Sequence, residues 1–387
     1  MCTVKTGFSL IVAAMLLIAM AGCSRSWSNF SQAPGFSEYY AQNPRNSQAA
    51  TPEEQTLLNR FRPRLFLDAT SEGPISFYRD YIAQGVLKDS AGKVLSEQVD
   101  SRQLNQVRDN PNIEFVHQPQ PGPVTPEVFA RIDYDEHPRL GKLAFLTYHF
   151  VFRSSGMAAG LPGWQELLLP LIGDPDDWHQ LDHYTSAIVV LDESATAIAL
   201  ILQQHNHERS YVLGVDLPRP ENGNIRLVAA KRSNELYPWH NGVEEHRIVR
   251  FMSDETLPYL VTGQSKPWLA GNDVTEAARE VDYQLSYIPA SDAFYRFTGY
   301  LGQRRSMAGR DGPPGADYNT LPIFKRPVVR LVAFNWQEDD IRQMNALLDF
   351  FTDARTDQPS FNNLLDNFKA KLVVGQGEDK KGEVAEK

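Results

Sequence analysis

The chain reads Leu-Ala-Phe-Leu-Thr-Tyr-His-Phe-Val-Phe from residue 143 to residue 152, a run dominated by aromatic and aliphatic side chains. Such a run is typical of a β-strand that is buried in a core. Three further strand-like runs follow at residues 186–191, 197–204 and 225–230, and polar, turn-rich segments separate them. No helical pattern lies between these runs, so we expect successive strands to pair antiparallel.

Helical patterns flank this strand-rich region. Residues 51–61 begin with Thr-Pro-Glu-Glu, in which Thr51 and Glu54 are spaced to form a helix-capping box. Residues 273–287 and 338–354 show two further patterns typical of helices. The sequence therefore predicts an α+β fold with an antiparallel β-sheet or sandwich core and flanking helices.

The chain divides into segments of different composition. Residues 51–372 carry the strand and helix patterns and are predicted to form a single main globular domain. Within it, residues 88–126 are polar and rich in proline, so we expect a surface excursion with little regular structure. Residues 24–50 contain no Leu, Ile or Val and are expected to form a flexible tether, and residues 373–387 a charged, disordered tail.

The N-terminal segment carries an apolar run from Phe8 to Ala21. The end of this run overlaps the four residues Met20-Ala21-Gly22-Cys23. The run is too short to span a bilayer and reads as an export signal. The four residues resemble the lipobox of bacterial lipoproteins, which implies that residues 1–22 are removed and that Cys23 is lipidated, with palmitate among the acyl groups. Ser24 after the cysteine resembles the pattern of lipoproteins sent to the outer membrane. The alternative is an ordinary secretory signal cleaved nearby.

Charge and cysteine content narrow the function further. The chain has 38 basic and 48 acidic residues, which argues against nucleic acid as a partner and against a polybasic membrane-binding face. Cys2 and Cys23 are its only cysteines, and Cys2 lies in the segment that the signal would remove. The mature protein is therefore expected to have no disulfide, and lipid rather than charge would hold it to the membrane.

The densest group of chemically active residues spans 173–184 and 204–208. Asp177, His179, His183 and His205, with His207 nearby, are residue types that bind zinc or another divalent metal ion. If residues 178–184 are extended, His179 and His183 point to the same face, and a bound ion could activate water for hydrolysis. The alternative is structural, with these side chains forming hydrogen bonds at strand ends and at a proline-containing turn.

Residues 143–240 also resemble a known family in the order of their motifs. The order is Tyr148-His149-Phe150, Asp177-Trp178, Gln204-His205-Asn206 and the run from Val228 to Tyr237. It is similar to the β-sandwich family of necrosis-inducing and vacuolar-sorting-related proteins, in which an Asp-Trp-Glu element and nearby histidines line a divalent-metal site. Residue by residue, the resemblance implies such a role for Asp177 and for His205, whereas His179 stands where the family has glutamate.

Two functional hypotheses remain from the sequence. Gly-x-Ser-x-Gly and the phosphate-binding Gly-x-x-x-x-Gly-Lys-Ser/Thr pattern are both missing from the sequence. The first hypothesis is a lipid-anchored protein of the bacterial envelope that acts as a non-catalytic binding or structural module for an envelope protein or a glycan. The second is a metal-dependent hydrolase, or a metal-stabilised binding domain, that uses the Asp/His cluster. The two differ in whether those side chains converge on one point.

Overall fold

The computed structural model describes residues 44–137, 141–156, 177, 180–204, 207–214, 217–220, 223–231, 233–239, 247–248, 268–269 and 278–302. The lipobox, the 338–354 helix and the 373–387 tail, all expected from the sequence, lie outside these residues. Within them, sheets predominate over helices and the fold is α+β.

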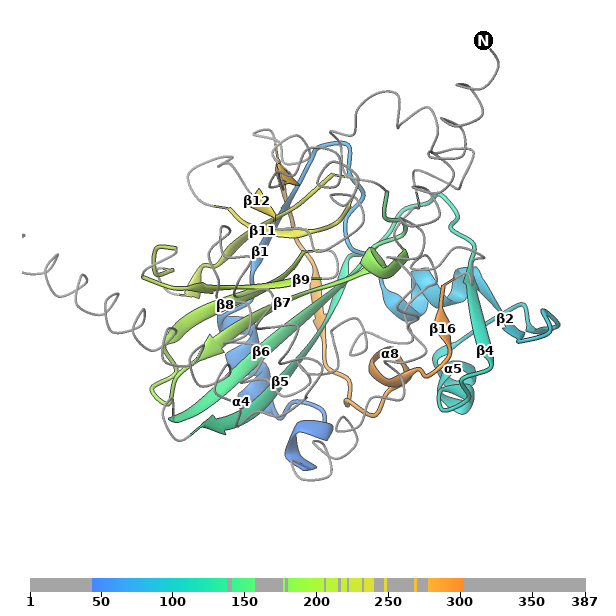
Figure 1. Cartoon of the computed structure of the whole chain (residues 1–387), viewed down its shortest axis with the longest axis horizontal. Coiled ribbons are helices and arrows are strands. Elements are labelled where there is room, and N and C mark those ends of the chain that lie inside the picture. Colours follow the sequence, from blue (N-terminus) through green and yellow to red (C-terminus); the bar gives the residue numbers. More distant parts are fainter. Residues whose placement is uncertain are drawn as a thin grey trace, which may run out of the picture.

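A six-stranded sheet forms the centre of the molecule, in the order β15-β5-β6-β7-β8-β9 (Figure 1). Its strands are β5 (Glu127–His137), β6 (Gly141–Val151), β7 (Tyr184–Leu191), β8 (Ala197–Gln204), β9 (His207–Val212) and β15 (Gln284–Ser286). Neighbouring strands from β5 to β9 are antiparallel, whereas β15 pairs parallel with β5. The expected strands at residues 143–152, 186–191 and 197–204 and their antiparallel pairing are confirmed.

A second, four-stranded sheet packs across one face of the first. Its order is β11-β10-β1-β14, formed by β11 (Leu236–Pro238), β10 (Arg226–Ala229), β1 (Arg64–Leu67) and β14 (Arg279–Val281). Apolar side chains from both sheets, including Leu146, Val189 and Leu227, form one buried cluster between them. The strand expected at 225–230 is therefore present as β10. It pairs parallel with β1. Strand β1 lies far away in the sequence and inserts between β10 and β14.

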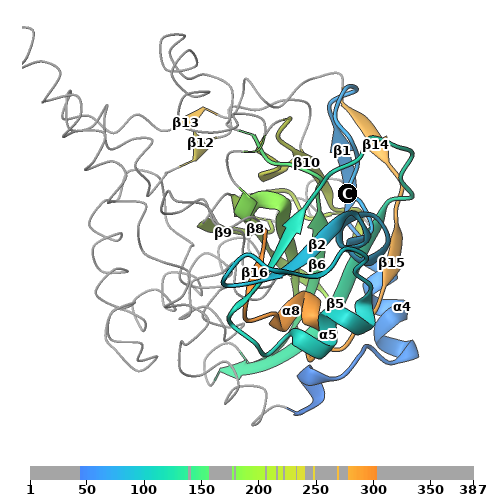
Figure 2. The ribbon, with the colours of Figure 1, turned by 90° about the vertical axis from the view of Figure 1, so that its right-hand side faces the viewer.

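A third sheet, in the order β16-β4-β2-β3, lies against one end of the long strands, where β5 and β7 begin and β6 ends (Figure 2). It contains β2 (Gly85–Asp89), β3 (Val94–Ser96), β4 (Ile113–His117) and β16 (Tyr300–Leu301), with the helices α5 (Ser101–Val107) and α8 (Ala293–Arg296) beside it. The expectation of little regular structure at 88–126 was wrong. The mostly exposed segment buries four side chains, Val99, Leu104, Ile113 and Phe115, and these help to complete a second core.

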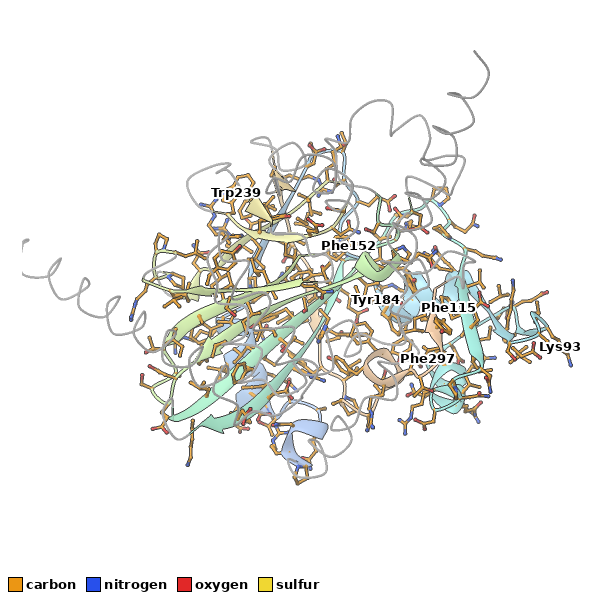
Figure 3. All side chains as sticks on the ribbon, in the orientation of Figure 1. Lys93, Phe115, Phe152, Tyr184, Trp239 and Phe297 are labelled. Carbon is orange, nitrogen blue, oxygen red and sulfur yellow. The ribbon has the colours of Figure 1, made fainter. Side chains whose placement is uncertain are left out.

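The second core is largely aromatic. The ring of Phe77 meets those of Phe129, Tyr184 and Phe294 edge to face, with ring centroids 6.2, 5.9 and 4.7 Å away. Figure 3 labels Tyr184 from β7, Phe115 from β4 and Phe297 after α8, which all belong to this core. The third sheet is thus attached to the six-stranded sheet through a layer of rings.

The local sequence pattern predicted one helix correctly and a second helix wrongly. Helix α4 (Pro52–Arg60) begins at a complete capping box between Thr51 and Glu54, as expected. The helix expected at 273–287 was wrong for the residues described there, because residues 279–281 and 284–286 are strands β14 and β15. Each pairs with a strand far away in the sequence, and this pairing overrides the local pattern.

The expected tether ends earlier than residue 50. Residues 44–47 form the 3₁₀ turn η1 (Pro44–Ser47), and the Asn46 amide both accepts from the Tyr134 N–H and donates to the Tyr134 carbonyl, each at 3.0 Å. Arg45 also forms an ion pair with Glu54. Residues 44–50 therefore belong to the folded domain, because their polar groups bind the end of β5.

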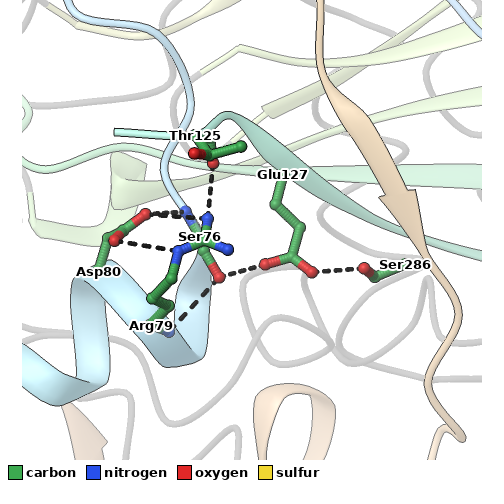
Figure 4. A network of polar contacts seen from close by, with 6 residues as sticks. All are labelled: Ser76, Arg79, Asp80, Thr125, Glu127 and Ser286. Carbon is green, nitrogen blue, oxygen red and sulfur yellow. Dashed lines mark hydrogen bonds and ion pairs between the residues drawn. The ribbon is translucent and has the colours of Figure 1, made fainter. Parts of the chain in front are cut away.

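Glu127 at the start of β5 joins three elements (Figure 4). Its carboxylate accepts hydrogen bonds from the hydroxyls of Ser76, the N-cap of the π-helical turn η2 (Phe77–Tyr81), and of Ser286 in β15. Arg79 in the same turn donates to the Thr125 carbonyl oxygen at 2.7 Å. This network fixes the parallel strand β15 and the turn η2 against the edge of the six-stranded sheet.

Candidate functional site

Asp177 and His183 form a hydrogen-bonded pair at the start of β7. His183 ends the 3₁₀ turn η5 (Gln180–His183), and its Nε2 lies 2.5 Å from Asp177 Oδ1. The backbone N–H of Ser155 donates to the same carboxylate oxygen at 3.2 Å, and the Gln180 amide donates to Oδ2 at 3.0 Å. The His183 side chain is 1% exposed and that of Asp177 22% exposed, so the pair lies just beneath the surface.

The Asp177 carboxylate is ionised at neutral pH. Burial raises its pKa, but the charge of His183 and the hydrogen bonds from His183, Gln180 and Ser155 together hold the pKa well below the usual range of an aspartate. A carboxylate that accepts from His183 Nε2 requires a hydrogen on that nitrogen. The other nitrogen of the ring, Nδ1, therefore determines the charge state of His183.

Tyr81, at the end of η2, meets His183 from the other side. Its hydroxyl oxygen lies 2.8 Å from His183 Nδ1 and 3.1 Å from the carbonyl oxygen of Leu301 in β16. Because a carbonyl can only accept, the hydroxyl donates to Leu301 and then accepts from an Nδ1–H, which makes His183 an imidazolium. If His183 is neutral, the hydroxyl donates to Nδ1 instead. In both arrangements, the two ring nitrogens of His183 bind groups of the protein itself.

A second histidine, His117 at the end of β4, packs against Tyr81. The two rings are nearly parallel, with centroids 3.9 Å apart and an interplanar angle of 16°. His117 Nδ1 lies 3.2 Å from the Tyr81 carbonyl oxygen and donates to it, so Nε2 carries the lone pair. That Nε2 is buried and has no hydrogen-bond partner among the described residues.

His117 is neutral at physiological pH. Burial, the largest cause, and the charges of His183 and Arg153 lower its pKa from 6.5 to about 3, although Asp177 and the hydrogen bond to the Tyr81 carbonyl raise it. Arg153 lies at the end of β6, where it donates to Glu72 at 2.8 Å and to the Gln84 side chain at 3.2 Å. A positive charge on His117 would therefore be repelled by the guanidinium of Arg153.

The polar chain continues from Asp177 into the four-stranded sheet. Ser155, which binds Asp177 through its N–H, donates from its hydroxyl to the carbonyl of Ser233 at 3.2 Å. Asn234, in the left-handed conformation with φ of 59°, donates from its amide to the Ser154 carbonyl at 2.7 Å. Both residues form the tight turn between β10 and β11. The chain of hydrogen bonds from this turn through Asp177, His183 and Tyr81 to β16 thus connects the three larger sheets.

The sequence-predicted site residues are only partly brought together. Asp177 and His183 are in direct contact, as a shared site requires, whereas His179 and His205 lie outside the described residues. Residues 180–183 form a 3₁₀ turn, so the extended conformation considered for 178–184 does not apply to them. His207 begins β9 beside Gln204 of β8. Tyr81 and His117 were missed, because no local signal associates them with residues that lie many positions away.

The described residues do not fit a metal ion at this place. A histidine ligand needs a free lone pair on the coordinating nitrogen, and both nitrogens of His183 already bind Tyr81 and Asp177. Across the described ranges, no group of three or more His, Cys, Asp or Glu side chains is placed to hold a metal ion. Among the described residues, the Asp177–His183 pair forms hydrogen bonds that connect parts of the fold, and the metal site expected at Asp177, His179, His183 and His205 stays a prediction.

Comparison with protein-family models, with curated proteins and with solved structures found no match to this chain. The resemblance of residues 143–240 to the necrosis-inducing and vacuolar-sorting-related family stays a prediction. In the part of the chain that the structure describes, no helix is long and apolar enough to cross a membrane. The function is therefore inferred from the residues of this chain.

Proposed function

We propose that this chain is a lipid-anchored protein of the bacterial cell envelope whose folded domain is a non-catalytic binding or structural module. The observation that supports a non-catalytic role is the arrangement of the Asp177–His183–Tyr81 chain, in which every polar atom of the histidine bonds to the protein. A general base needs a lone pair within reach of a substrate proton, and His183 presents none to solvent. Its hydrogen bonds stabilise the junction of three sheets instead.

The proposed anchor is the lipid on Cys23, which follows Met20-Ala21-Gly22 at the end of the apolar run. Removal of residues 1–22 would leave residues 24–43 between the lipid and η1. A flexible chain of that length has a root-mean-square reach of roughly 25 Å, enough to hold the domain clear of the headgroups. Ser24 favours the outer membrane as the destination. The partner of the domain would then be an envelope protein or an envelope glycan.

The anchor is tested by labelling with radioactive palmitate in a bacterial host that expresses the full chain. We expect label on the wild type and on Cys2→Ala, and no label on Cys23→Ala. Because Cys2 and Cys23 are the only cysteines, the Cys2 variant is a matched control for the loss of a thiol. Two results would contradict the proposal. They are label that persists in Cys23→Ala, and release of unlipidated protein from the cells at the same rate for the wild type and both variants.

The absence of metal-dependent catalysis is tested by the metal content of the purified full chain. After incubation with zinc or manganese and removal of excess ion, we expect much less than one ion per chain, and no change in the variant with both His179 and His183 replaced by alanine. One tightly held ion per wild-type chain, lost in the double variant, would favour the metal-dependent hydrolase instead. The measurement is independent of the lipid label.

A further inference from the structure

The outer face of the β11-β10-β1-β14 sheet, which points away from the main core, carries a small buried cluster around Phe66, and charged side chains and the partly buried Trp239 lie at the edge of this cluster. Arg64 in β1 lies directly beside Arg226 in β10, and Phe66 lies directly beside Glu280 in β14. Trp239 follows β11, and its backbone N–H donates to the Arg226 carbonyl at 2.9 Å. We call these five residues the outer-face patch. Leu65, Leu67 and Leu227, which alternate with them, face the core instead.

The patch has an excess of positive charge. Arg64 donates to the Glu280 carboxylate through two parallel hydrogen bonds, from Nε to Oε1 at 2.7 Å and from a second nitrogen to Oε2. This contact, with Arg226 at longer range, holds the pKa of Glu280 below its usual value even though partial burial raises it. Among the described residues, no carboxylate forms an ion pair with Arg226, which is exposed. One guanidinium is therefore left without a counter-charge.

The position of Arg226 opposite Arg64 is electrostatically unfavourable in the absence of a bound anion. Two like charges directly opposite each other on neighbouring strands destabilise a sheet. Both guanidinium groups lie over the same ring, with the Arg226 carbon 4.8 Å and the Arg64 carbon 5.5 Å from the Phe66 centroid. Ring contacts hold the Arg226 side chain in place while its hydrogen-bonding edge remains open. An arginine held in this way is prepared to bind a carboxylate, as its neighbour does.

An apolar ring surface adjoins this arginine. Trp239 is half-buried and stacks on Phe66, with ring centroids 5.0 Å apart and an interplanar angle of 21°. Figure 3 shows Trp239 well away from Phe115 and Phe297 of the second core. A binding surface that combines an aromatic face with an adjacent guanidinium suits a ligand with an apolar face and a carboxylate on the same ring. The carbon-bound hydrogens and the carboxylate of a uronic acid have this arrangement.

We propose that the outer-face patch binds a carboxylate-bearing saccharide, whose carboxylate pairs with Arg226 and whose sugar ring packs against Trp239. The proposal rests on the proposed function, because it names the partner of the binding module. Since the whole chain has a net charge of -10, this locally positive surface is also the place to which an anionic glycan would be drawn. The lipid anchor does not depend on this patch.

The test is calorimetric titration of the mature, lipidated chain in detergent with trigalacturonate, and with maltotriose as a neutral trisaccharide of similar size. We expect binding of trigalacturonate alone, weakened at least about tenfold in Arg226→Gln by loss of a charge-assisted contact. Arg226→Lys, which keeps the charge but not the planar fork, should bind with intermediate affinity. Arg102→Gln, which removes an exposed arginine on α5, should bind as the wild type does.

Three outcomes would overturn the inference. They are no binding of trigalacturonate by the wild type, equal binding of the two trisaccharides, and wild-type affinity in Arg226→Gln. Because Arg226 is exposed and faces away from the core, its replacement leaves the fold intact, which circular dichroism would verify. Any of these results alongside palmitate on Cys23 would reject the saccharide site and leave the anchored module standing.

Discussion

Acidification should destabilise this protein through His117, and the size of the effect follows from its surroundings. Its pKa is about 3 in the folded chain, against 6.5 when it is free of burial. Between these values, the unfolded chain binds a proton that the folded chain does not, so stability is highest above pH 6.5 and falls as the pH is lowered toward 3. Each pH unit below 6.5 costs about 1.4 kcal/mol, which gives about 2 kcal/mol at pH 5.

The assay is urea denaturation of the wild type and of His117→Phe at pH 7.5 and at pH 5. Phenylalanine keeps a ring against Tyr81 but cannot be protonated, and the lost hydrogen bond to the Tyr81 carbonyl costs about 1 kcal/mol at both pH values. The other histidines titrate in both proteins, so their contribution cancels in the difference. We expect the wild type to lose about 2 kcal/mol more than the variant on acidification. Equal losses in the two proteins would refute the reasoning.

Two further predictions concern burial and close packing. Asp177→Asn should lower the free energy of unfolding by about 2–3 kcal/mol, because it leaves His183 without its ionised partner. Asp109→Asn, which removes a carboxylate that is 76% exposed and paired with Arg108, should change it by less than about 0.5 kcal/mol in the same denaturation experiment. Gly299→Ala should reduce the yield of soluble protein sharply, because the added carbon would lie 2.1 Å from the Ile113 carbonyl oxygen. Gly122→Ala, whose added carbon meets nothing within 4 Å, should leave the yield unchanged. Equal losses of unfolding free energy in Asp177→Asn and Asp109→Asn would contradict the role of the Asp177–His183 pair. A normal soluble yield of Gly299→Ala would contradict the close packing at Gly299.

The sequence predicted the central sheet because its signal is local and strong. Residues 197–202 form an unbroken aliphatic run that ends at Gln203 and Gln204, and the strand β8 spans residues 197–204. The segment from β2 to β4 was missed for the opposite reason. Its strands are only three to five residues long, and they become strands through pairing with one another and through burial of a few side chains such as Phe115. Short strands whose stability comes from distant contacts carry little local signal.

The candidate site was predicted in part for a related reason. Asp177 and His183 lie close together in the sequence, and their residue types indicated a shared site. Their role as a connection depends on Tyr81 and on the backbone of Leu301, which the fold brings together from far away in the sequence. A histidine bound on both nitrogens and a histidine that coordinates a metal have the same sequence signature. Only the identity of the partner groups distinguishes them.

The position of β1 has a consequence for the order of folding. This strand is the first among the residues that the structure describes, yet it pairs with β10 on one side and β14 on the other, so both of its partners are synthesised long after it. The strands from β5 to β9 pair with their immediate neighbours and can form early, because little loop entropy opposes them. The apolar residues of β1 must therefore stay unpaired until residues 226–229 and 279–281 emerge. Until then, its exposed apolar side chains can aggregate, and a chaperone that covers them would protect the chain.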